Sequence, residues 1–281
     1  MTTARPEPVE HRVPVDDAVL TVEEHSPTRR GVGPAVVFLP ALGVPLAYYR
    51  PLLTRWADRG RRVLAVELRG MPQSPVPDLR RARFGYADLV RTDVPAVAAL
   101  AGDDVALVGH SLGGQLALLA TAAGTVRPTA VVTVATGTSS PSHLPRGRRW
   151  QRRAAVTTVR TVSAALTLWP GHRLGFAGRQ PRSLMRDWAH EARYGRYQLH
   201  GDPTDYETAL SGLAVPALML DVIGDRMIPA SAVDHLAARV GGPVTRATIR
   251  TTSPSDHFCW ARRSPDQVLD AVETWLATQQ R

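Results

Sequence analysis

The chain has 281 residues, 44% of them hydrophobic, which suffices for one large α/β domain with an insertion or for two small domains. Cys259 is the single cysteine, so an internal disulfide and a thiolate metal cluster are excluded, and a reducing compartment is indicated. Residues 1–9 lack the charged-then-apolar pattern of a signal peptide, and no apolar run approaches the roughly 20 residues that span a bilayer. We therefore expect a cytoplasmic protein without an integral membrane segment.

The positive charge of the chain is concentrated in one stretch. The formal net charge is +9, and because the sequence contains no lysine, every positive side chain counted is an arginine. Twelve arginines and only two acids lie between Arg146 and Arg196. No helix-turn-helix, RNP or zinc-knuckle pattern accompanies them, so we expect no nucleic-acid partner. An anionic substrate, or a peripheral contact with a lipid surface, is left open.

The first half of the chain predicts strands that alternate with helices. Residues 12–15 and 18–23 alternate in polarity around Asp16-Asp17, which is typical of a β-hairpin. Apolar runs predict buried strands at residues 35–39, 63–68, 105–109 and 130–135. Helices are predicted at residues 47–59, 86–101 and 115–123. We expect Pro95 to kink the second of these helices or to mark a helix start.

This alternation breaks between residues 136 and 210, where no clear strand is predicted and an amphipathic helix is expected around residues 154–168. It resumes with strands at 217–222 and 245–251 and helices at 231–240 and 265–279. Such alternation predicts a mainly parallel sheet with right-handed crossovers. An insertion on the carboxyl side of a strand lies where open sheets place their ligand crevice. We therefore predict an α/β core from residues 1–135 and 211–281, with a helical cap at residues 136–210.

The stretch Gly109-His110-Ser111-Leu112-Gly113 follows a predicted buried strand and precedes a helix of small residues. Strand, sharp turn and helix together are the context of a G-x-S-x-G nucleophile elbow, with Ser111 at its apex. The glycines are needed because a Cβ on either side of the turn would collide with the strand or the helix. The helix N-terminus directs free N–H groups towards a developing anion. Ser111 is therefore the candidate nucleophile, and His110 is expected to pack away from the substrate.

A serine nucleophile needs a base that takes its proton and an acid that orients the base. His257 lies between the last predicted strand and the terminal helix, and it alone among the nine histidines holds that position. Asp225 follows the preceding strand and is the preferred acid. Asp221 would lie within that strand, beneath the site. Asp256 is adjacent to His257 in sequence, which places it badly for the ring nitrogen that faces away from the nucleophile.

An oxyanion hole needs two backbone N–H groups. The amide of Leu112, directly after the candidate nucleophile, is the first. The second is expected from the loop Leu39-Pro40-Ala41-Leu42-Gly43, which follows a predicted strand. Pro40 has no N–H and cannot donate, so we choose the amide of Leu42.

From the strand at residues 35–39 to Trp275 the chain resembles the α/β-hydrolase superfamily. The resemblance rests on the elbow, on Glu67-Leu68-Arg69-Gly70-Met71-Pro72-Gln73-Ser74, on Asp225-x-x-x-Pro229 and on His257-Phe258. The chain departs from many members at Pro40-Ala41, where they carry His-Gly. Other motifs are similar to a group of poorly characterised bacterial hydrolases: Gly43-Val44-Pro45, Tyr48-Tyr49-Arg50, Trp169-Pro170-Gly171, Arg173-Leu174-Gly175-Phe176 and Met185-Arg186-Asp187-Trp188. The resemblance implies a Ser–His–Asp hydrolase with a helical cap and implies no particular substrate.

We predict a serine hydrolase that cleaves an ester, thioester or lactone of a small to medium substrate through an acyl-enzyme on Ser111. The alternatives are an acyltransferase, a tailoring enzyme that cyclises or eliminates on the same fold, and a non-catalytic ligand-binding protein. No metal or nucleotide cofactor is expected, since Gly31-Val32-Gly33 lacks the rest of a phosphate loop. The cap tryptophans, Trp150, Trp169 and Trp188, are expected mostly to pack the cap onto the sheet. The oligomeric state is not predicted.

Overall fold

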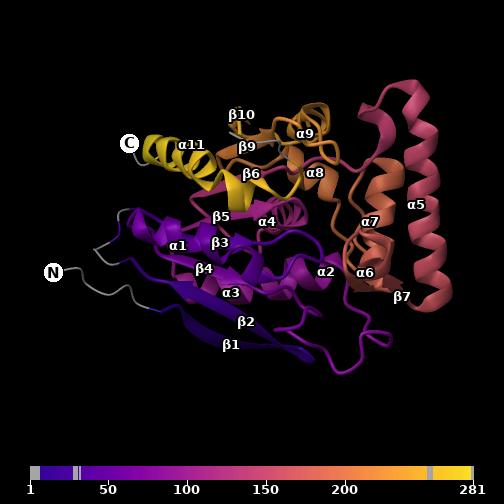
Figure 1. Cartoon of the computed structure of the whole chain (residues 1–281), viewed down its shortest axis with the longest axis horizontal. Coiled ribbons are helices and arrows are strands. Elements are labelled where there is room, and N and C mark those ends of the chain that lie inside the picture. The colour runs from indigo at the N-terminus through magenta and orange to yellow at the C-terminus, as the bar shows by residue number, and fades with distance from the viewer. Residues whose placement is uncertain (1–6, 28–30, 32, 252–255, 280–281) are drawn as a thin grey trace.

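One eight-stranded sheet forms the centre of the molecule (Figure 1). The structure is a computed structural model that describes residues 7–27, 31, 33–251 and 256–279. The strand order is β1-β2-β4-β3-β5-β6-β9-β10; β1 pairs antiparallel with β2, β2 antiparallel with β4, and the other pairs are parallel. The strands are β1 (Val9–Val15), β2 (Ala18–His25), β3 (Ala35–Leu39), β4 (Val63–Val66), β5 (Val105–His110), β6 (Ala130–Val134), β9 (Ala217–Val222) and β10 (Val244–Ile249). The predicted hairpin and mainly parallel sheet are therefore confirmed.

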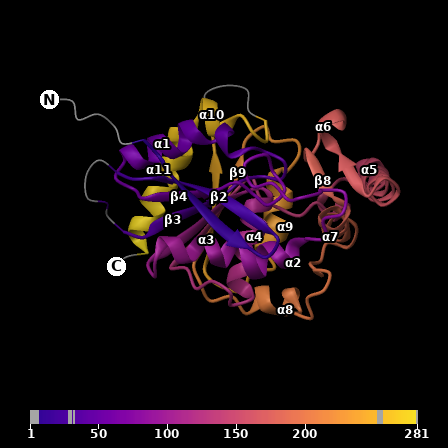
Figure 2. The same ribbon diagram turned by 90° about the horizontal axis from the view of Figure 1, so that it is seen from below.

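Two layers of helices cover the two faces of this sheet (Figures 1 and 2). One apolar core lies under α1 (Arg50–Asp58), α10 (Trp260–Arg263) and α11 (Pro265–Thr278). The other lies under α2 (Tyr86–Asp88), α3 (Val94–Ala101), α4 (Leu112–Ala122), α8 (Tyr206–Ser211) and α9 (Ala230–Ala237). Successive strand side chains point to opposite faces, so Phe38 joins the first core and Val37 the second.

The helix boundaries differ from expectation at three places. A 3-10 turn, Leu46–Tyr48, precedes α1, and α4 begins directly after Ser111. In the helix predicted at residues 86–101, a π-helical turn (Leu89–Asp93) connects α2 to α3, and Pro95 lies in the first turn of α3. Val94 donates its N–H to the carbonyl oxygen of Leu89, so the helical backbone runs directly from the π-helical turn into α3. Pro95, which has no N–H to donate, therefore lies where the helix geometry changes, at the start of α3.

Within residues 136–210, called the insert below, residues 146–194 form a separate layer beyond the carboxyl ends of the strands, whereas α8 lies against α4 (Figures 1 and 2). The insert contains a 3-10 turn (Pro141–His143), α5 (Arg146–Leu166), β7 (Leu168–Pro170), α6 (Gly171–Leu174), β8 (Arg179–Pro181), α7 (Arg182–Tyr194) and most of α8. The expectation of no strand was wrong, since β7 and β8 pair antiparallel. Three-residue strands are too short to produce a visible alternation. The amphipathic helix expected around residues 154–168 begins earlier, at Arg146, and ends at Leu166.

The insert contacts the core through α7, which packs on α2, and through α8, which packs on α4. Seven of the thirteen residues of α7 are buried, whereas α5 buries only Val156, Val159 and Ser163 over 21 residues and packs on α7. The carboxylate of Asp187 on α7 accepts the N–H of Tyr86 in α2 at 2.9 Å and that of His200 at 3.3 Å. None of the helices in the described parts of the chain is both long enough and apolar enough to span a bilayer.

Candidate active site

The turn between β5 and α4 holds Ser111 in a backbone conformation that non-glycine residues seldom adopt, with φ 54° and ψ −114°. Glycines on either side let the backbones approach closely. A Cβ at Gly109 would lie 2.1 Å from the carbonyl carbon of Gly113, and one at Gly113 would lie 2.0 Å from the carbonyl oxygen of Leu39. At these distances a Cβ would collide with the backbone, which is why both positions require glycine. The turn therefore places Ser111 directly after the carboxyl end of β5 and directly before α4.

Ser111, His257 and Asp225 are joined by hydrogen bonds. His257 Nε2 lies 2.9 Å from Ser111 Oγ, and His257 Nδ1 lies 2.7 Å from Asp225 Oδ2. The other oxygen of Asp225 accepts the backbone N–H groups of Met227 (2.8 Å) and Ile228 (2.9 Å). These two bonds orient the carboxylate, which is fully buried together with the His257 ring. The structure therefore brings together the three side chains that the sequence proposed.

The two alternative acids make other contacts. Asp221 lies in β9, forms an ion pair with Arg246 at 2.9 Å and accepts the hydroxyl of Thr248 at 3.1 Å. Asp256 accepts the backbone N–H groups of Phe258 at 2.8 Å and Cys259 at 2.7 Å. Because Asp225 occupies the Nδ1 side of His257, it is the acid positioned to orient that ring.

His110 packs away from the pocket, as expected, but it also makes hydrogen bonds that the sequence did not suggest. Its Nε2 lies 2.9 Å from the carbonyl oxygen of His257, and its Nδ1 lies 2.7 Å from the hydroxyl of Tyr49. The ring is completely buried, and this burial holds the pKa of His110 well below its usual value, so the ring is neutral. A neutral ring that donates from Nε2 and accepts at Nδ1 fits both contacts. His110 thus supports the backbone that carries His257.

The candidate oxyanion donors are the amides of Leu42 and Leu112, and both residues line the pocket at Ser111. The amide of Ala41 donates instead to Tyr49 Oη at 3.2 Å. Leu112 is the first residue of α4, so its N–H has no partner within the helix. Ala41 has no positive φ, and the residue of this loop that needs glycine is Gly43, at φ 73°. Alanine at position 41 is therefore compatible with the loop.

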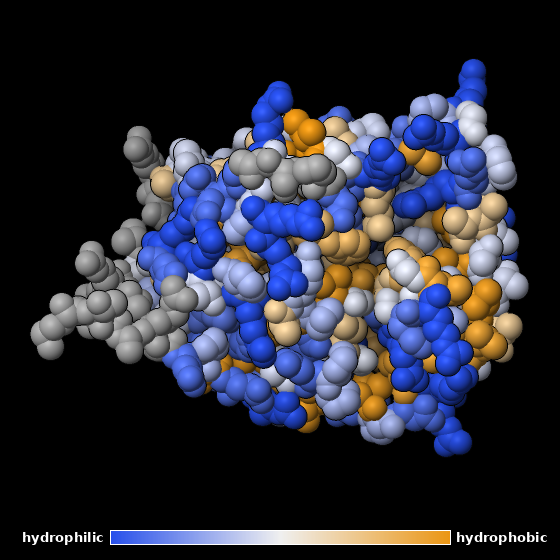
Figure 3. All heavy atoms as spheres, viewed as in Figure 1, coloured by the Kyte–Doolittle hydropathy of each residue, from blue (hydrophilic) through white to orange (hydrophobic). Residues whose placement is uncertain are grey.

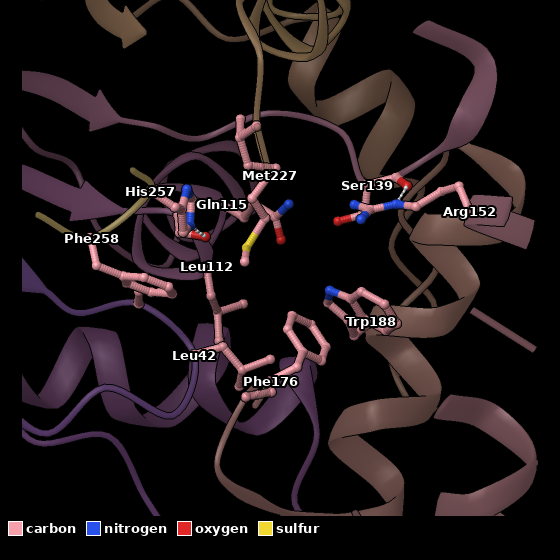
Figure 4. Close-up of a pocket in the computed structure, with 14 residues that line it drawn as sticks. Leu42, Leu112, Gln115, Ser139, Arg152, Phe176, Trp188, Met227, His257 and Phe258 are labelled. Carbon is pink, nitrogen blue, oxygen red and sulfur yellow. Dashed lines mark hydrogen bonds between the residues drawn. The ribbon is translucent and has the colours of Figure 1, made fainter. Parts of the chain in front are cut away.

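A pocket opens over Ser111 between the sheet and the insert (Figure 4). The core contributes Ala41, Leu42, Ser111, Leu112, Gln115, Met227, Ile228, His257 and Phe258, and the insert contributes Ser139, Arg152, Phe176, Ala177 and Trp188. Sequence reasoning had not placed Gln115, Ser139, Arg152 or Met227 at the site. No periodic sequence pattern identifies these four residues as pocket residues, because each belongs to a different helix or loop.

The three tryptophans expected mostly to pack the insert behave differently from one another. Trp169 is buried and donates its indole N–H to the carbonyl oxygen of Phe176 at 2.8 Å. Trp188 is also largely buried, but it lines the pocket. Trp150 is 65% exposed and does not pack the insert onto the sheet. Within the described ranges, no three histidine, cysteine, aspartate or glutamate side chains are grouped so that they could hold a metal ion.

Comparison with known proteins identifies the family. The model of the alpha/beta hydrolase family matches residues 36–271. Over 99 residues the chain is 35% identical to "Putative carbamate hydrolase RutD" from Variovorax paradoxus, a match that spans 35% of this chain and 35% of that protein.

Solved structures of low sequence identity share the fold. Alpha/beta hydrolase domain-containing protein 10 from mouse matches with a TM-score of 0.67 and 16% identity, over 96% of this chain and 99% of that one. The esterase RhEst1 from Rhodococcus sp. ECU1013 matches with a TM-score of 0.59 and 21% identity, over 98% of this chain and 100% of that one. With the family match over most of its length, the chain belongs to the alpha/beta hydrolase family.

Proposed function

We propose that the protein is a serine hydrolase that cleaves an ester, thioester or lactone through an acyl-enzyme on Ser111. The observation that carries the proposal is the hydrogen-bonded series Ser111–His257–Asp225, with Ser111 Oγ facing the pocket. This arrangement combines a nucleophile, a base within reach of its proton and an acid that orients the base. The esterase and carbamate hydrolase names among similar proteins agree with hydrolytic chemistry.

The proposed reaction begins when His257 Nε2 takes the proton of Ser111 Oγ as the oxygen attacks the substrate carbonyl carbon. The oxyanion that forms is held by the amides of Leu42 and Leu112. Collapse of the tetrahedral intermediate breaks the bond to the leaving group, which receives the proton from His257. Water then attacks the acyl-enzyme, with His257 again as base, and Ser111 is regenerated. Asp225 holds His257 in the required tautomer and stabilises the imidazolium.

We further propose that the insert acts as the cap of this site. Arg152, Phe176, Ala177 and Trp188 of the insert line the same pocket as Ser111, which supports this role. Gly43 in the oxyanion loop lies directly against the insert, since a Cβ there would come within 2.2 Å of the Ala177 backbone. A substrate at Ser111 would therefore be enclosed by core residues on one side and insert residues on the other.

Labelling with a fluorophosphonate probe tests the proposed nucleophile. We expect the wild type to be labelled and Ser111→Ala to be unlabelled, with turnover of p-nitrophenyl esters reduced about 10³-fold or more. Ser139→Ala, which removes another pocket hydroxyl, is the matched control and should still be labelled. Equal labelling of wild type and Ser111→Ala would overturn the proposal. Addition of an alcohol acceptor distinguishes hydrolysis from acyl transfer, because a transferase forms the acceptor ester in preference to the free acid.

A further inference from the structure

Arg152 places a positive charge in the wall of the pocket. It projects from α5, and its half-buried side chain lines the same pocket as Ser111. Figure 4 shows Arg152, Ser139 and Trp188 together on the side of the cavity that faces His257 and Gln115. A substrate bound at Ser111 and extended across the cavity would therefore meet the Arg152 guanidinium with its far end.

The guanidinium of Arg152 is only partly satisfied by the protein. Its Nε donates to the carbonyl oxygen of Ser139 at 3.1 Å. In the described parts of the chain no carboxylate forms an ion pair with it, whereas Arg50 in the core pairs with Glu23 at 2.6 Å. The carboxylate of Glu191 is close enough to Arg152 to interact with its charge. The two oxygens of this carboxylate, however, accept hydrogen bonds from the Thr138 hydroxyl at 2.5 Å and the Ser139 amide at 2.9 Å. Arg152 therefore retains donors for a further acceptor.

Burial makes this arrangement costly unless a ligand completes it. Desolvation lowers the pKa of Arg152 from its usual value, yet an arginine remains protonated in a protein. A desolvated charge that no carboxylate contacts directly costs free energy, part of which an anion in the pocket would recover. No aspartate or glutamate side chain lines the pocket in the described residues, so a ligand carboxylate would meet no repelling charge there.

Trp188 supplies a second donor and an apolar wall beside the arginine. Its indole nitrogen points into the cavity next to the Arg152 guanidinium (Figure 4). Its ring packs against Phe176 with centroids 5.1 Å apart, and both rings line the pocket. One guanidinium and one indole N–H match a planar, singly charged carboxylate with two accepting oxygens, whereas a phosphate dianion carries twice the charge of the single arginine among the lining residues. The aromatic rings suit the apolar chain that precedes such a group.

We propose that Arg152 binds a carboxylate at the end of the substrate remote from the scissile carbonyl, so that the substrates are acyl compounds carrying a second, anionic carboxyl group. The inference rests on the proposed function, since it assigns the specificity of the same site. Arg152 is a binding residue in this proposal and takes no part in bond making or breaking.

Matched ester pairs test the proposal kinetically. Monomethyl adipate and methyl hexanoate have acyl chains of equal length and differ in the terminal carboxylate; 4-acetoxybutanoate and butyl acetate place the same difference on the leaving group. For the wild type, we expect kcat/KM to favour the charged ester of at least one pair. Arg152→Gln should lower kcat/KM for that charged ester about 10- to 100-fold, as expected for a lost charge-assisted hydrogen bond, and should change the neutral ester less than about threefold.

Two variants control for structural effects. Arg148→Gln removes an exposed arginine from the same helix and should leave both esters unaffected. Arg152→Lys keeps the charge without the planar fork and should retain part of the preference. The proposal is overturned if the wild type prefers the charged ester in neither pair. It is also overturned if Arg152→Gln lowers kcat/KM equally for the charged and the neutral ester of a pair.

Binding measurements separate this proposal from the proposed chemistry. Ser111→Ala cannot form an acyl-enzyme, so its affinity for monomethyl adipate and 4-acetoxybutanoate can be measured by calorimetry without turnover. We expect Ser111→Ala to bind at least one charged ester, and Ser111→Ala with Arg152→Gln to bind it at least about tenfold more weakly. If the double variant binds the charged ester more weakly but the wild type has no esterase activity, the proposed hydrolysis is refuted and the carboxylate site is supported. Esterase activity with equal binding by both variants would refute the carboxylate site alone.

Discussion

The sheet core and the insert use arginine in opposite ways. In the core, several arginines pair with acids, as Arg50 does with Glu23 at 2.6 Å and Arg69 with Asp93 at 2.5 Å. None of the six arginines of α5 in the insert forms an ion pair with an acid among the described residues: four are exposed, Arg149 donates to the carbonyl oxygens of Ser142 and Leu144, and Arg152 lines the pocket. The paired core arginines thus hold elements together, whereas the four exposed arginines of α5 remain available for contacts with other molecules.

Large apolar side chains also differ between the two regions, being exposed at several places in the insert and buried in the central strands of the core. Several large apolar residues of the insert are exposed: Trp150, Leu166, Leu174 and Tyr194. Figure 3 shows apolar residues beside strongly hydrophilic ones at the end of the molecule where α5 lies. In the core, the side chains at β3, β5 and β6 are almost entirely buried. We therefore propose that the core supplies stability and the reacting groups, whereas the insert supplies surfaces for recognition.

The largest effect is expected from Asp225, because the proposed chemistry resides in the core. Asp225→Asn removes the acceptor of His257 Nδ1–H and favours the wrong tautomer, so kcat should fall about 10³- to 10⁴-fold. Asp256→Asn is the matched control, since Asp256 accepts backbone N–H groups on the neighbouring turn. Its activity should stay within about tenfold of the wild type. Equal losses in the two variants would contradict the assignment of Asp225.

A smaller effect is expected at the junction of the two regions. Burial raises the pKa of Asp187 to about 6, against hydrogen bonds from the Tyr86 and His200 amides that lower it. Its contribution to stability is therefore complete at low pH and is lost as the pH rises through about 6, by about 3 kcal/mol in total. We compare the free energy of unfolding of the wild type with that of Asp187→Asn. The difference, wild type minus variant, should fall by about 3 kcal/mol as the pH rises from about 4 to about 7. Urea denaturation across this range measures it, and a flat difference would show that Asp187 does not titrate in this way.

The smallest effect is expected on the outer surface of the insert, which we propose makes peripheral contact with anionic lipid. Exposed Trp150 beside the arginines of α5 suits a membrane interface. Co-sedimentation with phosphatidylglycerol vesicles should decrease about three- to tenfold in Trp150→Ser and should weaken at high salt. Val19→Ser, at an exposed apolar residue of β2 in the core, is the control and should bind as the wild type does. Equal sedimentation of Trp150→Ser and wild type would contradict the proposed contact.

The core was largely predictable from the sequence because its constraints are local. An apolar run followed by Gly109-x-Ser111-x-Gly113 admits few backbone arrangements, and the close contacts of both glycines explain why. Chain order in a parallel sheet brings successive strand ends to one edge, so residues such as Asp225 and His257 could be placed near Ser111 without coordinates. The sequence excluded only Pro40 as an oxyanion donor, since proline has no N–H, and the role of the Leu42 amide stays a prediction.

The sequence by itself therefore determined the sheet, the elbow and the residues that come together above it. Only the tertiary structure decided which insert residues reach the pocket, that β7 and β8 pair, and that His110 supports the His257 backbone. The arginines of α5 look alike in sequence, and the packing of α5 on α7 selects Arg152 to face the cavity. The physical reason is that backbone sterics and strand order act along the chain, whereas the lining of a pocket depends on how separate elements pack.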